Sequence, residues 1–392
     1  MKKNRNLIII ALVALVNSIG YGIIIPILEG YTSKFGLNDF QFGLLFALFS
    51  LCQFVATPII GRLSDKYGRK PLLVISLAGT AISFIMMAFA NSAAMLFLAR
   101  ALDGITAGNI PVASAVISDT TEIKDRAKGF AVFGASFGFG FVFGPAISAL
   151  TVNISQSLPF IIAGAITIVA VLATIFFLPE TNKHIGEVKK GKLFDFKALF
   201  HAIRDENVGK TFLITLFYFL AFGILISRFQ PFARKVLMFS ERDIAFTFML
   251  FGVVGLVTQL FLLHRITNKF GLKKTYNAMF ILIALSFIGF FFTRNAVAFM
   301  IFSVFLGFAN AAINPLTQTI LSRETDEKSQ GTMQGLNSSY MSIGNIIGPL
   351  LAGLLATFSV SLPFLASSVL CVLCYFLSLH VLNPHTRKQS AF

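Results

Sequence analysis

The feature that most constrains this chain is a succession of long apolar runs separated by short polar connections. Because an α-helix needs about 20 apolar residues to cross a lipid bilayer, runs of this length predict transmembrane helices. Twelve such runs can be read, over residues 7–28, 40–60, 72–91, 94–118, 127–149, 158–178, 211–231, 243–263, 275–293, 296–320, 331–356 and 360–382. The sequence therefore predicts an all-α integral membrane protein with twelve transmembrane helices.

The composition agrees with lipid, rather than water, as the solvent of this chain. Hydrophobic residues make up 56% of it and charged residues only 12%, against roughly 25% charged residues in a soluble domain. The net charge of +15 raises the question of nucleic acid, but the basic residues stand in short clusters between apolar runs, with no interleaved basic and aromatic patch. We expect no nucleic-acid partner.

The distribution of positive charge predicts the orientation. With the N-terminus placed in the cytoplasm, most of the 32 Lys and Arg residues fall in connections on the cytoplasmic side. Cytoplasmic loops of membrane proteins carry this excess. We therefore expect both termini in the cytoplasm and a multi-pass protein of a bacterial cytoplasmic membrane.

The two halves of the chain resemble each other. The segment 61–70, which reads GRLSDKYGRK, has a counterpart in 264–273, which reads HRITNKFGLK. Two further matches follow in the same order and at nearly the same offset: Gly140-x-x-x-Gly144-Pro145 recurs as Gly344-x-x-x-Gly348-Pro349, and Pro111 recurs as Pro315. Such agreement indicates an internal duplication.

A duplication of six helices suits a transporter built from two parallel repeats, with its binding site between them near the middle of the bilayer. We predict two pseudo-symmetric six-helix bundles, over residues 1–178 and 209–392, joined by a cytoplasmic loop over 179–208.

Three motifs resemble those of the major facilitator superfamily. They are Gly61-x-x-x-Asp65-x-x-Gly68-Arg69-Lys70 between the second and third runs, Arg100-Ala101-Leu102-Asp103-Gly104 in the fourth, and Gly134-Ala135-Ser136-Phe137-Gly138-Phe139-Gly140-x-x-x-Gly144-Pro145 in the fifth. The last resembles the motif of the drug:proton antiporter branches. Within them the chain is similar to the tetracycline-resistance-like efflux group, and this resemblance implies a twelve-helix antiporter engaged in efflux and multidrug resistance.

The resemblance assigns roles to two of these motifs. Gly61, Asp65, Gly68 and Arg69 form a conformational latch, in which Asp65 docks on the cytoplasmic end of the eleventh helix near 331–334. The alternative for Asp65 is local charge balance among basic neighbours. The second motif, made of Gly134, Gly138, Gly140, Gly144 and Pro145, is a packing motif that seals the outer side and favours export. Its alternative is plain close packing of helices through small residues.

Arg100 and Asp103 are the ionisable residues that the sequence places deepest in a predicted span. Charged groups at this depth are costly and usually functional, and residues three apart share a helix face. Burial disfavours the ionised carboxyl of Asp103, whereas Arg100 favours it. We expect this pair to couple transport to protons, with Asp103 as the carrier. The alternative is a mutually neutralising pair that only packs two helices together.

Other polar residues in the spans are candidates for a substrate cavity with apolar walls. The predicted substrate-binding residues are Asn17, Tyr21, Gln53, Asn109, Asn310 and Asn314. The resembled group has an Asp where this chain has Asn17, and acids in the third and ninth helices where no carboxylate stands near Ser83 or Ala284. Proton coupling therefore depends on Asp103, and tetracycline itself is not the expected substrate.

These observations predict a secondary active transporter that exports a small amphipathic or cationic compound in exchange for protons. Two alternatives stay open: an uncoupled facilitator or importer on the same fold, and a receptor or scaffold that has lost transport. We expect no cofactor, metal ion or enzymatic activity, because no metal-ligand cluster, phosphate-binding loop or nucleophile–base pair can be found in the sequence. We also expect a monomer. Arg228 stands near a predicted span end, where we expect its side chain to reach the membrane interface.

Overall fold

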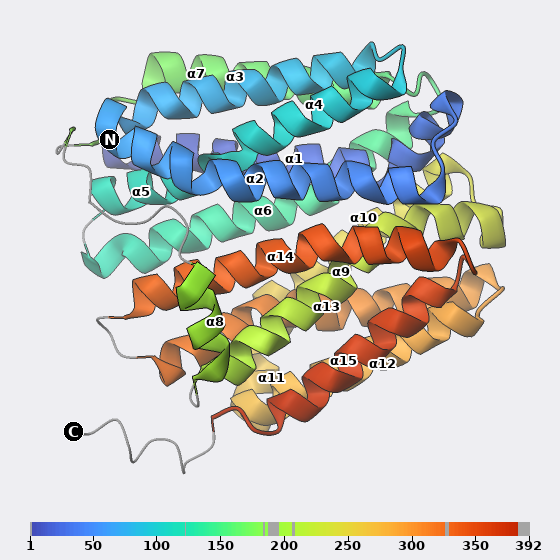
Figure 1. The fold of residues 1–392 in the computed structure, drawn as a ribbon. Coiled ribbons are helices and arrows are strands. Elements are labelled where there is room, and N and C mark those ends of the chain that lie inside the picture. Colours follow the sequence, from blue (N-terminus) through green and yellow to red (C-terminus); the bar gives the residue numbers. More distant parts are fainter. Residues whose placement is uncertain are drawn as a thin grey trace. The chain divides into compact units, whose positions relative to one another are not determined.

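The computed structural model describes residues 2–121, 123–182, 185–186, 196–205, 208–325 and 329–382, and their regular structure is helical (Figure 1). The helices of the first half are α1 (Lys2–Thr32), η1 (Ser33–Phe35), α2 (Asp39–Tyr67), α3 (Arg69–Ala88), α4 (Ala93–Thr106), η2 (Ala107–Asn109), α5 (Ile110–Thr120), α6 (Ile123–Thr151) and α7 (Leu158–Phe177). Those of the second half are α8 (Phe196–Arg204), α9 (Gly209–Leu237), α10 (Glu241–Val257), η3 (Thr258–Leu262), α11 (Leu263–Phe270), α12 (Leu272–Phe292), α13 (Ala296–Glu324), α14 (Gln330–Ala356) and α15 (Leu362–Ser378).

Ten helical segments among the described residues are long and apolar enough to cross a membrane. Two further predicted spans correspond to shorter elements: α15 is an apolar helix of 17 residues, and the fourth span consists of α4, η2 and α5 in succession. The predicted all-α membrane fold is confirmed.

Two details of the sequence prediction need correction. The fourth span was expected to be one helix over 94–118, but a short 3-10 turn over Ala107–Asn109 divides it. The predicted cytoplasmic loop over 179–208 contains a short amphipathic helix, α8. Much of that loop, including Lys189, Lys190 and Lys192, lies outside the described residues.

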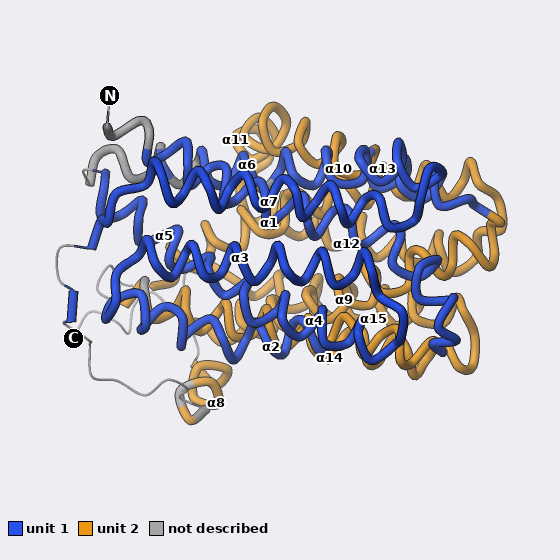
Figure 2. The backbone as a smooth tube through the Cα atoms, turned by 90° about the horizontal axis from the view of Figure 1, so that it is seen from above, with its two compact units in different colours: residues 1–38, 48–193, 239–249 blue, residues 39–47, 194–238, 250–392 orange. Residues whose placement is uncertain are grey.

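The chain divides into two compact units. The first contains residues 1–38, 48–193 and 239–249, and the second contains 39–47, 194–238 and 250–392 (Figure 2). The units therefore do not follow the sequence halves strictly. The first nine residues of α2 belong to the second unit, and the residues of α10 that precede Leu250 belong to the first unit.

The packing inside each unit reveals the duplication. Gly22 of α1 faces α6 so closely that a Cβ atom on it would lie 2.9 Å from Cδ of Pro145 and 3.2 Å from Cα of Gly144. In the second unit, a Cβ atom on Gly223 of α9 would lie 2.9 Å from Cδ of Pro349 on α14, with Gly348 beside it. The matching Gly and Pro residues thus bring the same two helices together in each unit.

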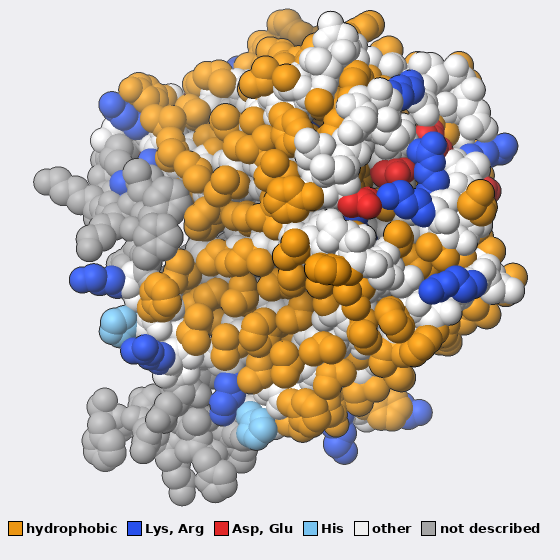
Figure 3. Space-filling model, turned by 45° about the vertical axis from the view of Figure 1, so that its right-hand side comes forward, with side chains coloured by type: hydrophobic (Ala, Val, Ile, Leu, Met, Phe, Trp, Pro, Cys, Tyr) orange, Lys and Arg blue, Asp and Glu red, His pale blue; other side chains and the backbone are white. Residues whose placement is uncertain are grey.

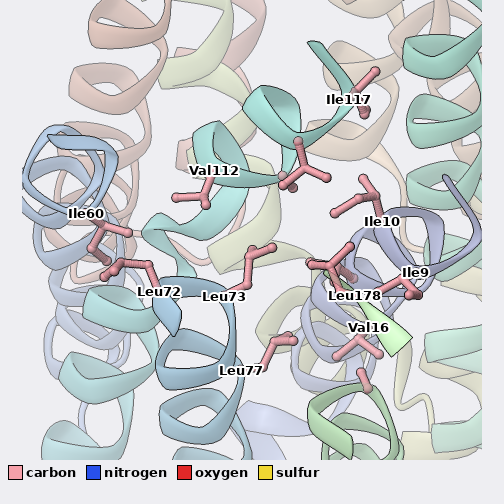
Figure 4. Packing of buried hydrophobic residues seen from close by; sticks show 14 of the residues in the cluster. Ile9, Ile10, Val16, Ile60, Leu72, Leu73, Leu77, Val112, Ile117 and Leu178 are labelled. Atoms are coloured by element: carbon pink, nitrogen blue, oxygen red, sulfur yellow. The ribbon is translucent and has the colours of Figure 1, made fainter. Parts of the chain in front are cut away.

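The core of the first unit is purely aliphatic where α1, α3 and α5 meet. Ile10, Leu73, Leu77 and Val112 are among the buried side chains there, and Figure 4 shows them directed toward one another. On the face drawn in Figure 3, hydrophobic side chains form a broad continuous cover, and most charged side chains stand at its margins. Exposed apolar surface of this extent is expected where lipid is the solvent.

Candidate functional site

The charged pair predicted from the sequence forms in the first unit. Arg100 and Asp103 lie on one face of α4, and Nη1 of Arg100 donates to Oδ2 of Asp103 at 2.8 Å. Their residues are 1% and 5% exposed. Because a charge removed from water is costly, only a closely matched pair of this kind is tolerated at such a position.

An aromatic ring covers the guanidinium group. The Arg100 Cζ atom lies 4.2 Å from the ring centroid of Phe49 on α2, a distance that permits a cation–π interaction. Tyr21 of α1 continues this aromatic wall, with its ring 5.8 Å from that of Phe49 and 6.2 Å from that of Phe141 on α6. Aromatic side chains of three other helices therefore form one wall beside the charged pair.

Pro111 stands directly after the break between α4 and α5 and removes one backbone donor there. Proline has no N–H group, so it cannot donate to the carbonyl four residues earlier, which belongs to Ala107. Gln53 of α2 supplies the missing donor, since its Nε2 atom lies 3.3 Å from that carbonyl oxygen. This hydrogen bond holds the Gln53 side chain beside the break.

Asn17 and Asn109 meet at the same break. Nδ2 of Asn17 donates to Oδ1 of Asn109 at 3.2 Å and to the Val13 carbonyl at 2.9 Å. Asn109 is fully buried, and its Nδ2 atom has no hydrogen-bond partner among the described residues. An amide donor in this condition is available to a ligand or to water.

The two remaining predicted substrate residues belong to the second unit. Asn310 of α13 accepts a short hydrogen bond from the Tyr218 hydroxyl of α9 through its Oδ1 atom, and Asn314 is exposed one turn further along α13. Asn17, Tyr21, Gln53, Arg100, Asp103 and Asn109 are all found in the first unit. The structure therefore brings six of the predicted residues into one unit and two into the other.

The predicted loop between the second and third spans is a turn at Gly68 alone, because Gly61 and Asp65 lie in α2 and Arg69 begins α3. Charged side chains hold this turn together. Nη1 of Arg69 lies 2.6 Å from Oδ1 of Asp65, and its Nε lies 3.3 Å from Oδ2 of Asp119 at the end of α5. Gly68 adopts φ 106° and ψ 157°, a conformation that is essentially restricted to glycine. Gly61 has open space around it. The docking of Asp65 on the eleventh helix stays a prediction.

Glu180 is a functional neighbour of this loop that the sequence reasoning missed. Its carboxylate accepts from the backbone N–H groups of Arg69 at 2.9 Å and Lys70 at 3.1 Å, and also from those of Thr181 and Asn182. It therefore caps the start of α3, where a negative charge is favourable. The only available signal was its position in the segment Pro179-Glu180-Thr181-Asn182 after the sixth span.

The glycines of the α6 motif differ in their surroundings. A Cβ atom on Gly140 would overlap the Ser18 side chain, and one on Gly144 would lie 2.7 Å from the Ile19 carbonyl oxygen. Gly134, by contrast, has no atom within 4 Å of such a position, and Gly138 is half-buried. Gly140, Gly144 and Pro145 therefore form the close contact with α1.

Ser83 is a second missed neighbour of the charged pair. This fully buried residue of α3 lies beside the Asp103 carboxylate. The sequence reasoning noticed it only because the resembled efflux group has an acid in that helix. Residue spacing along one helix cannot show which side chains of another helix will face it.

Comparison with known proteins agrees with this arrangement. The sequence profile of the Major Facilitator Superfamily matches residues 10–262 and 211–392. Multidrug resistance protein 1 of Bacillus subtilis is 31% identical over 94% of each chain. The class H tetracycline resistance protein of Pasteurella multocida is 29% identical over 91% of this chain and 90% of its own.

Solved structures show the same fold. A mutant form of the nucleoside transporter NupG superposes with a TM-score of 0.80 at 14% identity, covering 96% of this chain and 100% of its own. The human organic anion transporter MFSD10 superposes with a TM-score of 0.74 at 22% identity, and the match covers 96% of this chain and 99% of its own. The chain is therefore a multi-pass membrane transporter of small molecules, and it belongs to the Major Facilitator Superfamily.

Proposed function

We propose that this transporter exports a small amphipathic or cationic compound in exchange for protons, by alternating access across the cytoplasmic membrane. The observation that carries the proposal is the buried pair of Arg100 and Asp103, whose atoms lie 2.8 Å apart in the interior of the first unit. In this proposal the protein acts as a monomer with both termini in the cytoplasm, and its two six-helix bundles move against each other.

Asp103 is the proton carrier in this mechanism. Burial favours the protonated carboxyl and Arg100 favours the carboxylate, so the balance depends on how much water or other charge reaches the site. A cationic compound near Asp103 stabilises the carboxylate and releases its proton. A proton that arrives from the other side of the membrane reverses this step and releases the compound.

The neighbours of the pair support an amphipathic substrate. The half-buried Tyr21 offers an aromatic ring that attracts cations and flat apolar groups, and the unsatisfied amide donor of Asn109 offers one polar contact. Relatives of this chain are named for resistance to tetracycline, to several drugs and, for NorA of Staphylococcus aureus, to quinolones. These names support export of a drug-like compound.

An uncoupled facilitator or importer is the second candidate, and one observation favours it. Asn17, which occupies the place of an acid in the resembled efflux group, uses its amide to bind Val13 and Asn109. An amide does not titrate, so Asn17 cannot carry a transported proton. If Asp103 only neutralises Arg100, the same site passes its substrate without coupling.

Proton movement in proteoliposomes separates these candidates. Ethidium, a quinolone and tetracycline are added to vesicles that contain a pH-sensitive dye, with wild-type protein, Asp103→Asn and Asp243→Asn. Asp243 is an exposed carboxylate that caps the start of α10 through Ser240, so it receives the same substitution away from the site. Antiport predicts proton release with at least one compound in the wild type and in Asp243→Asn, and none in Asp103→Asn.

A different result identifies the facilitator. If a compound crosses the membrane equally in all three proteins without a pH signal, Asp103 is not a proton carrier and the proposal fails. If Asp103→Asn and Asp243→Asn lose activity together, the effect of charge removal is not specific to the site, and the proposed role of Asp103 fails as well.

A further inference from the structure

A second buried arginine lies far along α9, outside the site described above. Arg228 is 1% exposed, so the expectation that its side chain reaches the membrane interface was wrong. Its Nη1 atom lies 3.1 Å from Oδ1 of Asp39, the first residue of α2, and its Nη2 donates to the Asp39 carbonyl oxygen at 2.9 Å. The guanidinium group also lies 5.5 Å from the ring centroid of Phe42.

A lysine completes this ionic cluster. Nζ of Lys235, two turns further along α9, lies 3.1 Å from each carboxylate oxygen of Asp39. The Lys235 side chain is 44% exposed and that of Asp39 is 26% exposed. The Asp39 carboxylate therefore binds a buried arginine and a partly exposed lysine. Water can reach this carboxylate from the lysine side and compete for its ion pairs.

The backbone of α2 is also unusually close to α14 here. A Cβ atom on Gly43 would overlap the Pro349 carbonyl oxygen. A Cβ atom on Gly353 would lie 3.0 Å from Cα of Phe40 and 3.1 Å from the Asp39 carbonyl oxygen. Glycine on both helices thus permits a direct contact between backbones at this end of α2.

The path of α2 gives this contact its importance. Residues 39–47 belong to the second unit, whereas the same helix continues through 48–67 in the first (Figure 2). The opposite end of α2 belongs to the basic segment 61–70, which the charge distribution predicts to be cytoplasmic. Asp39 therefore lies at the predicted outer end of α2, in the part of this helix that packs with α9 and α14 inside the second unit.

We propose that Asp39 and Arg228, supported by Lys235, form an outer ionic lock that holds the start of α2 on α9 and α14. When the lock is closed, the outer ends of these helices stay together. When water hydrates Asp39 and the ion pair separates, α2 leaves α14 and the outer side opens. The lock acts on the alternation of the transporter itself and does not depend on whether transport is coupled to protons.

Disulfide formation between Phe40→Cys and Gly353→Cys reports on this lock. The crowding that Gly353→Cys adds is common to all proteins compared, because every lock variant carries the same cysteine pair. The three native cysteines, Cys52, Cys371 and Cys374, are replaced by Ala, and the purified full chain is studied in proteoliposomes. A control pair, Phe84→Cys with Gly164→Cys, joins α3 to α7 within the first unit, where a Cβ atom on Gly164 would lie 3.6 Å from Cβ of Phe84. That spacing suits a disulfide. Remaining thiols are counted by a gel shift with maleimide-polyethylene glycol.

We expect Asp39→Asn and Arg228→Gln each to slow oxidation of the 40–353 pair by roughly tenfold, a size common for coupling between conformational states. The double variant is expected to slow oxidation by less than the product of the two single factors, because both single variants remove the Arg228–Asp39 ion pair. Lys235→Gln, at an exposed position that folding tolerates, is expected to slow oxidation by roughly twofold, as befits a partly exposed pair. The 84–164 pair keeps its rate in every variant.

Two results overturn the proposal. If the 40–353 pair oxidises at the wild-type rate in Asp39→Asn and Lys235→Gln, the ion pair does not hold α2 in place. If the 84–164 pair slows by the same factor, the substitutions loosen the fold in general and no specific lock exists. Neither result bears on Asp103, so failure of this proposal is distinguishable from failure of proton coupling.

Discussion

Gln53 of α2 donates to the carbonyl oxygen of Ala107 at 3.3 Å, where α4 ends. Pro111 leaves this carbonyl without its ordinary helical partner. The contact ties α2 to the break that separates α4 from α5, and Asn17 and Asn109 meet at the same place. The geometry of the candidate site therefore depends on one proline and on a side chain from another helix.

Replacement of Gln53 by Leu is expected to lower stability by about 0.5–1.5 kcal/mol, because the Ala107 carbonyl loses its side-chain donor. Pro111→Ala restores an N–H group that can make this bond, so the double variant Gln53→Leu/Pro111→Ala should recover part of the loss. Thermal unfolding of the purified protein in detergent measures both effects. Equal melting temperatures for wild type and Gln53→Leu would contradict the role assigned to this hydrogen bond.

Gly140→Ala is expected to destabilise the protein by about 1–3 kcal/mol, the usual cost of overpacking. The added methyl group would meet the Ser18 side chain of α1. Gly134→Ala is the matched control on the same helix, since its methyl group meets nothing within 4 Å. Melting temperatures of the two variants should differ, and a loss of similar size in both would show that the contact with α1 is not the cause.

Gly68→Ala and Gly271→Ala test two causes of strain separately. Both glycines have positive φ, 106° and 83°, at corresponding positions of the repeat. Each substitution is expected to cost about 1–3 kcal/mol for the backbone conformation alone. Only at Gly68 would the new methyl group also meet the Glu180 carboxylate, so Gly68→Ala should melt at the lower temperature. Glu180→Ala also removes the cap of α3, so the clash is measured in a double-mutant cycle: Gly68→Ala should cost less stability in the Glu180→Ala background than in the wild type.

Arg100→Met is expected to destabilise the protein by about 3–5 kcal/mol, because it leaves the Asp103 carboxylate buried without its cation. The double variant Arg100→Met/Asp103→Asn removes both charges and should regain most of this stability while remaining inactive in proton exchange. Denaturation in detergent and the vesicle pH assay, run on the same preparations, distinguish the two roles. A double variant less stable than Arg100→Met would show that the charges do not act as a pair.

The charged pair could be predicted because its two residues stand close together in sequence. Arg100 and Asp103 are three positions apart on one helix, and their ion pair follows from helical periodicity. Arg228 could not be assigned in this way, since its partner Asp39 is on a distant helix. Glu180 and Ser83 were missed for the same reason: their partners are in segments that only folding brings near them.

The sequence by itself determined the class of this protein, because twelve apolar runs leave a membrane as the only suitable solvent and a repeated set of glycines and prolines records the duplication. It also determined which residues are costly to bury. The tertiary structure decided which partner stabilises each of these polar groups. Gln53 donates to the carbonyl of Ala107, Glu180 accepts from the first N–H groups of α3, and Asp39 pairs with Arg228. Local pattern encodes length, periodicity and propensity, whereas the partner of a buried polar group depends on long-range packing that no single segment contains.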